Sequence, residues 1–212
     1  MAKLTVLGST GATGRRLLSR ALDAGYRVTA VVRRPDALPV THANLNVVVA
    51  DVTDPQAMSG AVRGAVAVLS TLGSRQMCRP TTLYSAAARA ALAAMAETGV
   101  TRLVCVSAIP AEPDELKSPL ERHVIHPLLF RFFGGGYDDM RVMEAELRRS
   151  STNWTAFRPP YLTDAKGTGT YRFAVDAPLK GAWSISRDDL AKAMLESLDN
   201  QALFRHAVAI AH

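Results

Sequence analysis

The 212-residue sequence predicts a single α/β domain, spanning 1–212, built on a doubly wound, mostly parallel sheet with helices on both faces. Short β-branched apolar runs recur at helix-length intervals, and several stretches between them carry apolar residues at helical spacing. Such alternation favours a parallel sheet with right-handed crossovers. The first run passes directly into a glycine-rich turn, as expected where a strand leads into a helix packed on the sheet.

Six runs are predicted to be strands because they are short, apolar and rich in valine and leucine. They lie at residues 4–7, 28–32, 45–49, 66–70, 103–106 and 154–157. Their apolar residues are nearly continuous rather than alternating with polar ones. This pattern indicates burial on both faces of the sheet.

Four stretches are predicted to be helices from their apolar spacing. They contain Leu17, Leu18, Ala21 and Leu22; the alanine-rich segment 83–95; Met140, Met143 and Leu147; and Leu190, Met194, Leu195 and Leu198. The last helix is expected to begin at Ser186, which resembles an N-terminal cap followed by two acids in the first turn.

Residues 110–136 interrupt the alternation of predicted strands and helices, with four prolines and three consecutive glycines at 134–136. Between them lies an apolar stretch that includes Phe130. Long connections in a compact domain are usually functional or disordered. The segment is predicted to be either a lid over a substrate pocket, hinged at the glycines, or a helix packed on the core or on a dimer surface.

The charge distribution argues against nucleic acid as a partner. Net charge is 25 − 19 = +6, and residues 1–34 hold seven basic side chains against one acid, which accounts for the whole surplus. Nucleic-acid binding would need basic residues spread along a groove with aromatics between them. The surplus instead brackets the glycine turn, which favours a small anionic ligand; a solvated basic face is the alternative for several of these residues.

Other classes are excluded by composition. No apolar run approaches the ~20 residues that cross a bilayer, and no secretory leader is apparent, so a cytoplasmic monomer or homodimer with a small-molecule substrate and no membrane partner is expected. Two cysteines are too few for a disulfide framework and too isolated for a metal site, so we expect reduced thiols and no metal.

The glycine turn has the composition of a phosphate-binding loop. Its residues are Gly8, Ser9, Thr10, Gly11, Ala12, Thr13 and Gly14. The spacing alone is weak evidence, but the loop follows a predicted strand and opens a predicted helix. That context provides a tight turn, a close backbone approach and a helix N-terminus that favours an anion. We therefore predict a dinucleotide pyrophosphate here.

Arg33 and Arg34 follow the second predicted strand, where an NAD-specific domain usually has an acidic residue that binds the ribose 2′-hydroxyl. A guanidinium offers paired charged hydrogen bonds to a 2′-phosphate. NADP(H) is therefore the predicted cofactor, with Arg33 favoured as the phosphate ligand. Alternation along the strand points the two arginines in opposite directions, so which of them faces the cofactor stays open.

Two further strand ends complete the predicted cofactor edge, because ligands of such sheets lie outside the carboxyl ends of the strands. Asp51 and Val52 end the third strand, where Asp51 would accept a hydrogen bond from adenine or would cap the next turn. Leu72 and Gly73 follow the fourth strand, beside the expected ribose and nicotinamide.

Several motifs together resemble the atypical short-chain dehydrogenase/reductases, and within them the NAD(P)H-binding group that contains biliverdin reductase B, a flavin reductase, and the NmrA-like proteins. The motifs are the glycine loop, Asp51-Val52, Ser107-Ala108, Glu144-x-x-Leu147-Arg-x-Ser150, and Trp154-Thr155-x-x-Arg158-Pro159-Pro160-x-Leu162-Thr163-Asp164. The resemblance covers nearly the whole chain, and the Arg-Pro-Pro block is its most diagnostic part.

This resemblance implies a Rossmann domain with an extended NADP(H) across the strand ends. It implies that Ser107 lies near the nicotinamide and that Pro159 and Tyr161 border the ring and the substrate. The loop residues would hold the phosphates, and Arg33 the 2′-phosphate. Arg158 has a structural alternative, as the partner of a backbone carbonyl or a carboxylate.

The Tyr-x-x-x-Lys pair that many short-chain reductases use as proton donor is absent. Tyr137 and Arg141 have the same spacing, and on a helix Arg141 would stabilise the phenolate. They are one residue out of register, however, because the family positions fall on Gly136 and Met140. Tyr137 is therefore either a displaced acid or simply the first residue of a helix.

The missing donor favours a particular acceptor. Reduction of a carbonyl to an alcohol needs an acid, whereas hydride transfer to a flavin- or quinone-like acceptor produces a delocalised anion. The predicted function is NADPH-dependent reduction of a small conjugated acceptor, with Ser107 and Tyr137 as candidate catalytic residues and Phe130 and Tyr161 as candidates for stacking on it. The alternative is a non-catalytic NADP(H)-binding redox sensor of NmrA-like type.

Overall fold

Eight strands form the central sheet of the computed structural model, which describes residues 1–38, 40–74, 79–113 and 126–212. The strands are β1 (Lys3–Leu7), β2 (Arg27–Val32), β3 (Leu45–Val49), β4 (Ala67–Ser70), β5 (Arg102–Val106), β6 (Asn153–Arg158), β8 (Arg172–Val175) and β10 (His206–Ala211). Their order is β3-β2-β1-β4-β5-β6-β10-β8. All neighbouring pairs are parallel except β8, which runs antiparallel to β10.

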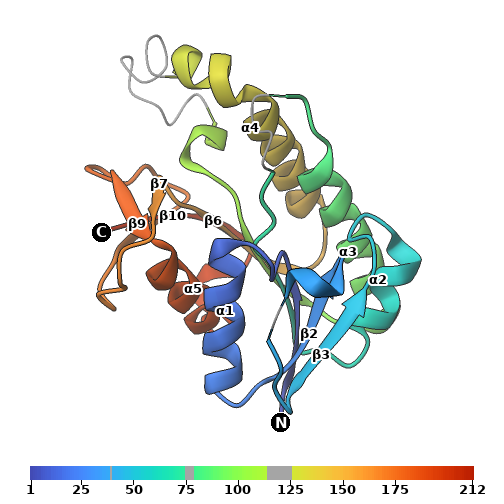
Figure 1. Cartoon of the computed structure of the whole chain (residues 1–212). Helices are drawn as coiled ribbons and strands as arrows, with labels where there is room; N and C mark the ends of the chain where they lie inside the picture. The colour runs from blue at the N-terminus through green and yellow to red at the C-terminus, as the bar shows by residue number, and fades with distance from the viewer. Residues whose placement is uncertain (39, 75–78, 114–125) are drawn as a thin grey trace.

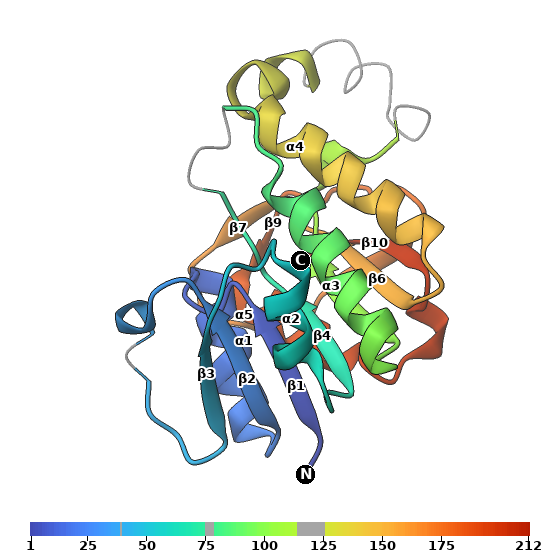
Figure 2. The same cartoon turned by 90° about the vertical axis from the view of Figure 1, so that its right-hand side faces the viewer.

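Helices cover both faces of this sheet (Figures 1 and 2). One face carries α1 (Ala12–Asp23) and α5 (Arg187–Glu196), and the other carries α2 (Pro55–Val62), α3 (Leu83–Thr98) and α4 (His126–Arg149). Apolar residues of the strands pack into both layers, which explains their nearly continuous burial. The predicted doubly wound fold with a mostly parallel sheet is confirmed.

Smaller elements complete the chain. They are the 3₁₀ turns η1 (Pro35–Ala37), η2 (Ile109–Ala111) and η5 (Gln201–Leu203), and a second, two-stranded parallel sheet of β7 (Tyr161–Thr163) and β9 (Ser184–Ser186). Helix α5 begins as predicted, with Ser186 Oγ accepting from the backbone N–H of Asp189 at 2.9 Å. No helix in the described part of the chain is long and apolar enough to cross a membrane.

The hinge predicted at the three glycines is wrong. Residues 134–136 lie inside α4, which continues unbroken to Arg149. A Cβ added to Gly135 would lie 2.2 Å from the carbonyl oxygen of Arg79, so glycine here permits a close approach of helix to backbone. Residues 126–136 are helical, as the alternative expected, and their packing on the core or on a dimer surface stays a prediction. Residues 114–125 and the side chain of Phe130 lie outside the description, so neither the lid nor the stacking role of Phe130 is tested.

Candidate functional site

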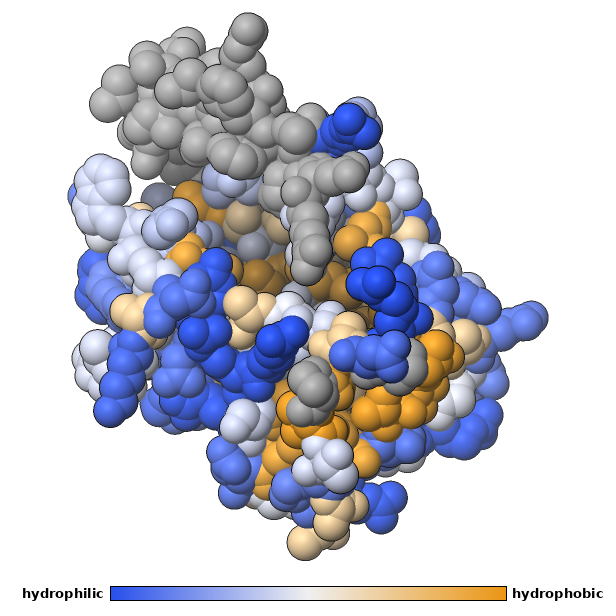
Figure 3. Space-filling model, viewed as in Figure 1, coloured by the Kyte–Doolittle hydropathy of each residue, from blue (hydrophilic) through white to orange (hydrophobic). Residues whose placement is uncertain are grey.

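Residues from six strand ends meet along one edge of the central sheet, because the six strands are parallel and adjacent. They are the glycine loop after β1, Arg33 and Arg34 after β2, Asp51 and Val52 after β3, Leu72 and Gly73 after β4, Ser107 after β5, and Pro159 after β6. This is the upper edge in Figure 1, and Figure 3 shows the molecule hollowed there, with apolar residues visible inside the hollow. The predicted site residues are thus brought together.

The glycine loop depends on backbone approaches that no other residue permits. Gly8 has φ +79°, and an added Cβ would lie 2.8 Å from the backbone carbon and oxygen of Thr71. A Cβ on Gly14 would lie 2.1 Å from the carbonyl oxygen of Gly8. Thr71 Oγ1 donates to the carbonyls of Leu7, at 3.1 Å, and Gly8, at 3.3 Å, which ties the end of β4 to the loop.

The N-terminus of α1 lacks a side-chain cap. Gly11 occupies the N-cap position, no side chain accepts from the first turn, and that turn contains no acidic residue. Its N–H groups and the helix dipole therefore favour an anion. The hydroxyl of Ser9 is buried with no hydrogen-bond partner in the described structure. An uncapped helix end and an unpaired loop hydroxyl fit a loop that a phosphate completes.

Arg33 and Arg34 are both exposed at the end of β2. The prediction that Asp51 caps the next turn is confirmed. Its Oδ1 accepts from the backbone N–H of Thr53 at 2.9 Å and from the Thr53 hydroxyl at 2.7 Å. These bonds, with a smaller contribution from the charge of Arg33, lower the pKa of Asp51. The contact of Asp51 with adenine stays a prediction, and the Val52 side chain is buried in the core.

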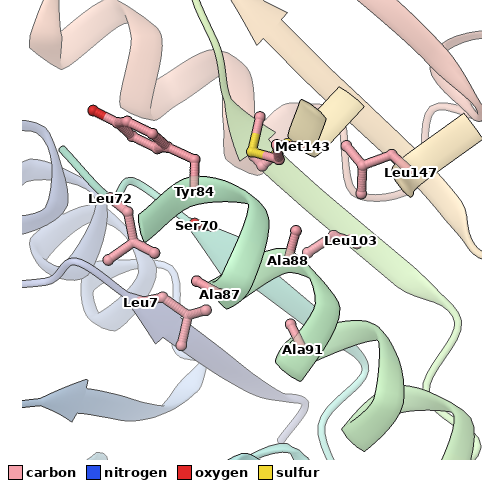
Figure 4. Close-up of a pocket in the computed structure, with 11 residues that line it drawn as sticks. Leu7, Ser70, Leu72, Tyr84, Ala87, Ala88, Ala91, Leu103, Met143 and Leu147 are labelled. Atoms are coloured by element: carbon pink, nitrogen blue, oxygen red, sulfur yellow. The ribbon is translucent and has the colours of Figure 1, made fainter. Parts of the chain in front are cut away.

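The small cavity in Figure 4 lies in the core beneath the ends of β1 and β4. It lies between the sheet, α3 and α4, and its lining is almost entirely apolar, including Leu7, Leu72 and Met143. The Cys105 thiol lies at this cavity, and burial raises its pKa far above the usual value, which makes it an unreactive thiol. Leu72 thus contributes to the core, while the neighbouring Gly73 is exposed.

A buried ionic cluster links β5, β6 and α4 beneath the site. Arg158 donates to Glu144 through Nε at 2.9 Å and through Nη2 at 2.5 Å, and Arg148 Nη2 donates to Glu144 at 2.9 Å. The Ser107 hydroxyl donates to Glu144 Oε1 at 2.8 Å. Glu144 is 1% exposed, and Ser107 and Arg158 are each 2% exposed.

The cluster confirms the structural alternative for Arg158. Burial alone would lower the pKa of its guanidinium, but the hydrogen bonds and charge of Glu144 outweigh burial and raise it. Glu144 was not among the predicted site residues. Its four-residue spacing from Arg148 on an amphipathic helix was visible, but its pairing with Ser107 and Arg158 depends on residues 37 and 14 positions away.

Tyr137 lies within α4 and is partly buried, so the prediction that it begins the helix is wrong. Burial, with a smaller effect from the neighbouring Tyr84, raises the pKa of its phenol. The lowering expected from Arg141 is therefore also wrong, because desolvation of the phenolate dominates. A role for Tyr137 in catalysis stays a prediction.

Two residues along α4, buried Asp139 accepts from the backbone N–H groups of Tyr84, at 2.7 Å, and Ser85, at 3.3 Å, so it caps α3.

Exposed aromatic side chains lie beyond the end of β6. The carbonyl of Pro159 accepts from the backbone N–H of Ile109 at 3.2 Å, which joins the segments that leave β5 and β6. Tyr161 is 75% exposed and pairs in register with Ser184, the residue after Trp183, which is 83% exposed. Trp183 directly precedes β9, so its location relative to β7 depends on the pairing of these two strands.

The strand order, the glycine loop and the uncapped helix define a dinucleotide-binding Rossmann domain. Residues 8–201 match the NAD(P)H-binding family, and the chain belongs to that family. The NAD(P)H-binding part of the resemblance drawn from the sequence is thereby confirmed.

Curated proteins and solved structures resemble this chain. The chain is 28% identical over 205 residues to YhfK of Bacillus subtilis, an uncharacterised sugar epimerase, covering 94% of this chain and 89% of the relative. It is 31% identical over 156 residues to (4-alkanoyl-5-oxo-2,5-dihydrofuran-3-yl)methyl phosphate reductase of Streptomyces griseus, covering 74% of this chain and 46% of the relative. A short-chain dehydrogenase/reductase from Veillonella parvula, solved in complex with NADP, is 18% identical, with a TM-score of 0.79 and coverage of 100% of this chain and 94% of that one.

Proposed function

We propose that this protein is an NADPH-dependent oxidoreductase that transfers hydride from nicotinamide C4 to a small conjugated acceptor of the flavin or quinone type. The single observation that carries this proposal is the state of the two candidate catalytic residues. The Ser107 hydroxyl donates to Glu144, and burial raises the pKa of Tyr137. Neither group is prepared to protonate a developing alkoxide.

The cofactor part of the proposal depends on the residues of the sheet edge. Backbone N–H groups at the N-terminus of α1 would hold the pyrophosphate, and the exposed guanidiniums of Arg33 and Arg34 would hold the 2′-phosphate. The Asp51 carboxylate, after β3, is already bonded to Thr53, so it is not arranged to bind a ribose 2′-hydroxyl. These features support NADPH over NADH, and the NADP complex of the V. parvula protein is consistent with them.

The acceptor part of the proposal depends on the states of Ser107 and Tyr137 and on two exposed aromatic side chains. Bound NADPH would supply the hydride, and the protein would orient the two reactants and exclude water. Tyr161 and Trp183 expose most of their aromatic surface at the end of the site, where they would stack on a planar acceptor. Because a delocalised product anion needs no strong acid, the lack of a prepared donor at Ser107 and Tyr137 is compatible with this chemistry.

The relatives give partial support. The S. griseus relative is a reductase whose named substrate is an alkanoyl-substituted oxo-dihydrofuran phosphate, which favours reductase chemistry for this chain. The B. subtilis relative carries the name of a sugar epimerase. Epimerisation through a ketone would need a group that takes and returns a hydroxyl proton, and the arrangement of Ser107 and Tyr137 disfavours it.

The direct test measures NADPH consumption by purified protein with a panel of flavins, quinones, dyes and simple aldehydes, and repeats it with NADH. We expect turnover with flavins or quinones, little with aldehydes, and slower rates with NADH. Preferred turnover of aldehydes would contradict the proposed acceptor. Tight NADP binding without turnover of any acceptor would instead support the redox-sensing regulator.

A further inference from the structure

The direction of one hydrogen bond limits what Ser107 can offer to a ligand. Glu144 receives three guanidinium hydrogen bonds, two from Arg158 and one from Arg148. A carboxylate surrounded in this way is ionised and can only accept. The bond between Ser107 Oγ and Glu144 Oε1, at 2.8 Å, therefore uses the only hydrogen of the serine hydroxyl.

We propose that Glu144, clamped by Arg158, is a positioning residue that makes Ser107 a hydrogen-bond acceptor toward the nicotinamide end of the site. A hydroxyl has one hydrogen and two lone pairs. With the hydrogen committed to Glu144, only the lone pairs remain for a ligand. Ser107 then selects an N–H donor, and the donor of suitable chemistry on the cofactor is the carboxamide N–H of the nicotinamide. This inference rests on the proposed cofactor but not on the identity of the acceptor.

The location and rigidity of Ser107 support this role. Ser107 directly follows β5 at the cofactor edge, and its backbone N–H donates to the carbonyl of Phe157 at 2.7 Å, which holds it against β6. Its side chain is 2% exposed, so only a small group inserted at the floor of the site would reach the hydroxyl. A carboxamide N–H is such a group.

Glu144 does not need Ser107 in order to be satisfied. Its two oxygens already accept three charged hydrogen bonds, so the serine adds a fourth, weaker donor. Ser107→Ala should therefore leave the Glu144–Arg158 pair and the fold intact. This makes the serine hydroxyl separable from the structural role of the ion pair.

The experiment compares the affinity of NADP⁺ with that of its 3-acetylpyridine analogue, in which a methyl ketone replaces the carboxamide and removes the N–H donor. Calorimetry on wild type should show preference for NADP⁺ of roughly five- to tenfold, the value of one hydrogen bond. Ser107→Ala should weaken NADP⁺ binding and leave the analogue nearly unchanged, so that the preference falls below about twofold.

Glu144→Asp provides a charge-preserving second variant. Aspartate retains the counter-charge for Arg158 but is one methylene shorter, so it should release the Ser107 hydrogen to rotate and donate to the ketone of the analogue. We expect the preference for NADP⁺ to shrink in this variant as well. A merely structural role would lower the melting temperature without changing the ratio of the two affinities.

The outcomes separate this inference from the proposed function. NADP⁺ binding and turnover with the same affinity ratio in wild type and Ser107→Ala would overturn the positioning role alone. Absence of any binding of NADP⁺ or NADPH to folded wild-type protein would overturn both proposals.

Discussion

The glycine loop and the cluster of Ser107, Glu144 and Arg158 lie at the same edge of the sheet but position their polar groups differently. The loop works through backbone: Gly8 and Gly14 allow the strand, the helix and the end of β4 to approach within distances that exclude a Cβ. The cluster works through side chains that converge from β5, α4 and β6 around one buried carboxylate.

This difference predicts different responses to mutation. A side chain added at the loop collides with backbone that has no freedom to move, so its effect on structure or binding is large. Removing the Ser107 hydroxyl leaves the three guanidinium donors to Glu144 in place, so its effect is specific and smaller. Replacements in the glycine loop therefore test the backbone packing of the site, and replacement of Ser107 tests a single hydrogen bond.

The largest expected effect comes from Gly14→Ala. The new Cβ would lie 2.1 Å from the carbonyl oxygen of Gly8, and relief of this overlap should cost about 3 kcal/mol or more of the free energy of unfolding. Thermal or denaturant unfolding measures it. The matched control is Gly60→Ala in α2, where nothing lies within 4 Å of the added Cβ and a gain of about 0.5 to 1 kcal/mol is expected. Equal stabilities of the two variants would contradict the packing argument.

Gly11→Val should abolish dinucleotide binding while leaving the fold largely intact. Its Cβ would lie 3.3 Å from the carbonyl of Gly8, a tight contact that small shifts can relieve, but the branched side chain would occupy the approach to the N-terminus of α1. We expect NADPH affinity to fall by about a hundredfold or more, as for a lost charged anion site. Titration calorimetry measures this, and unchanged affinity would show that the loop is not the site.

Asp189 tests whether convergent hydrogen bonds around a carboxylate stabilise the fold away from the proposed site. Burial alone would raise its pKa, but bonds from Thr168, Ser186, His212 and Gly169 lower it to about 2. Because the folded pKa lies below the usual value of 3.8, this stabilisation is complete above about pH 4 and is lost as pH falls toward about 2.

Asp189→Asn should therefore destabilise the protein by about 2 kcal/mol at neutral pH, and the difference from wild type should shrink in acid. Unfolding measured across this pH range checks the prediction. A difference that does not change between pH ~7 and ~2 would show that the charge of Asp189 is not what stabilises the fold.

The smallest of these effects is expected for Arg33→Ala combined with Arg34→Ala. Loss of both exposed guanidiniums should weaken NADPH binding by more than about tenfold and barely change NADH binding, because only NADPH has the 2′-phosphate. Arg27→Ala is a matched control, since Arg27 is exposed at the opposite end of β2. Equal losses for NADPH and NADH would refute the assignment.

Much of the fold was predictable because its signals are local. Six strands, the glycine loop and the Ser186 cap are each visible within a few neighbouring residues, and parallel strands necessarily place their carboxyl ends at one edge. The segments that carry the predicted cofactor residues therefore lie at one edge of the sheet. The strands β7 to β10 were missed because their runs are short or follow irregular segments, and their pairing involves distant partners.

Sequence by itself determined the strand–helix alternation, the glycine loop and the arginines after β2, because each depends on a short stretch of chain and its own backbone geometry. Only the tertiary structure decided the rest. The three glycines at 134–136 suggested a hinge, yet at Gly135 the absence of a Cβ admits the backbone of Arg79. Likewise, the hydrogen-bond partner of the Ser107 hydroxyl is decided only by the fold, which brings Glu144 Oε1 within 2.8 Å of it. Contacts between distant segments are set by packing of the whole chain, which no local pattern records.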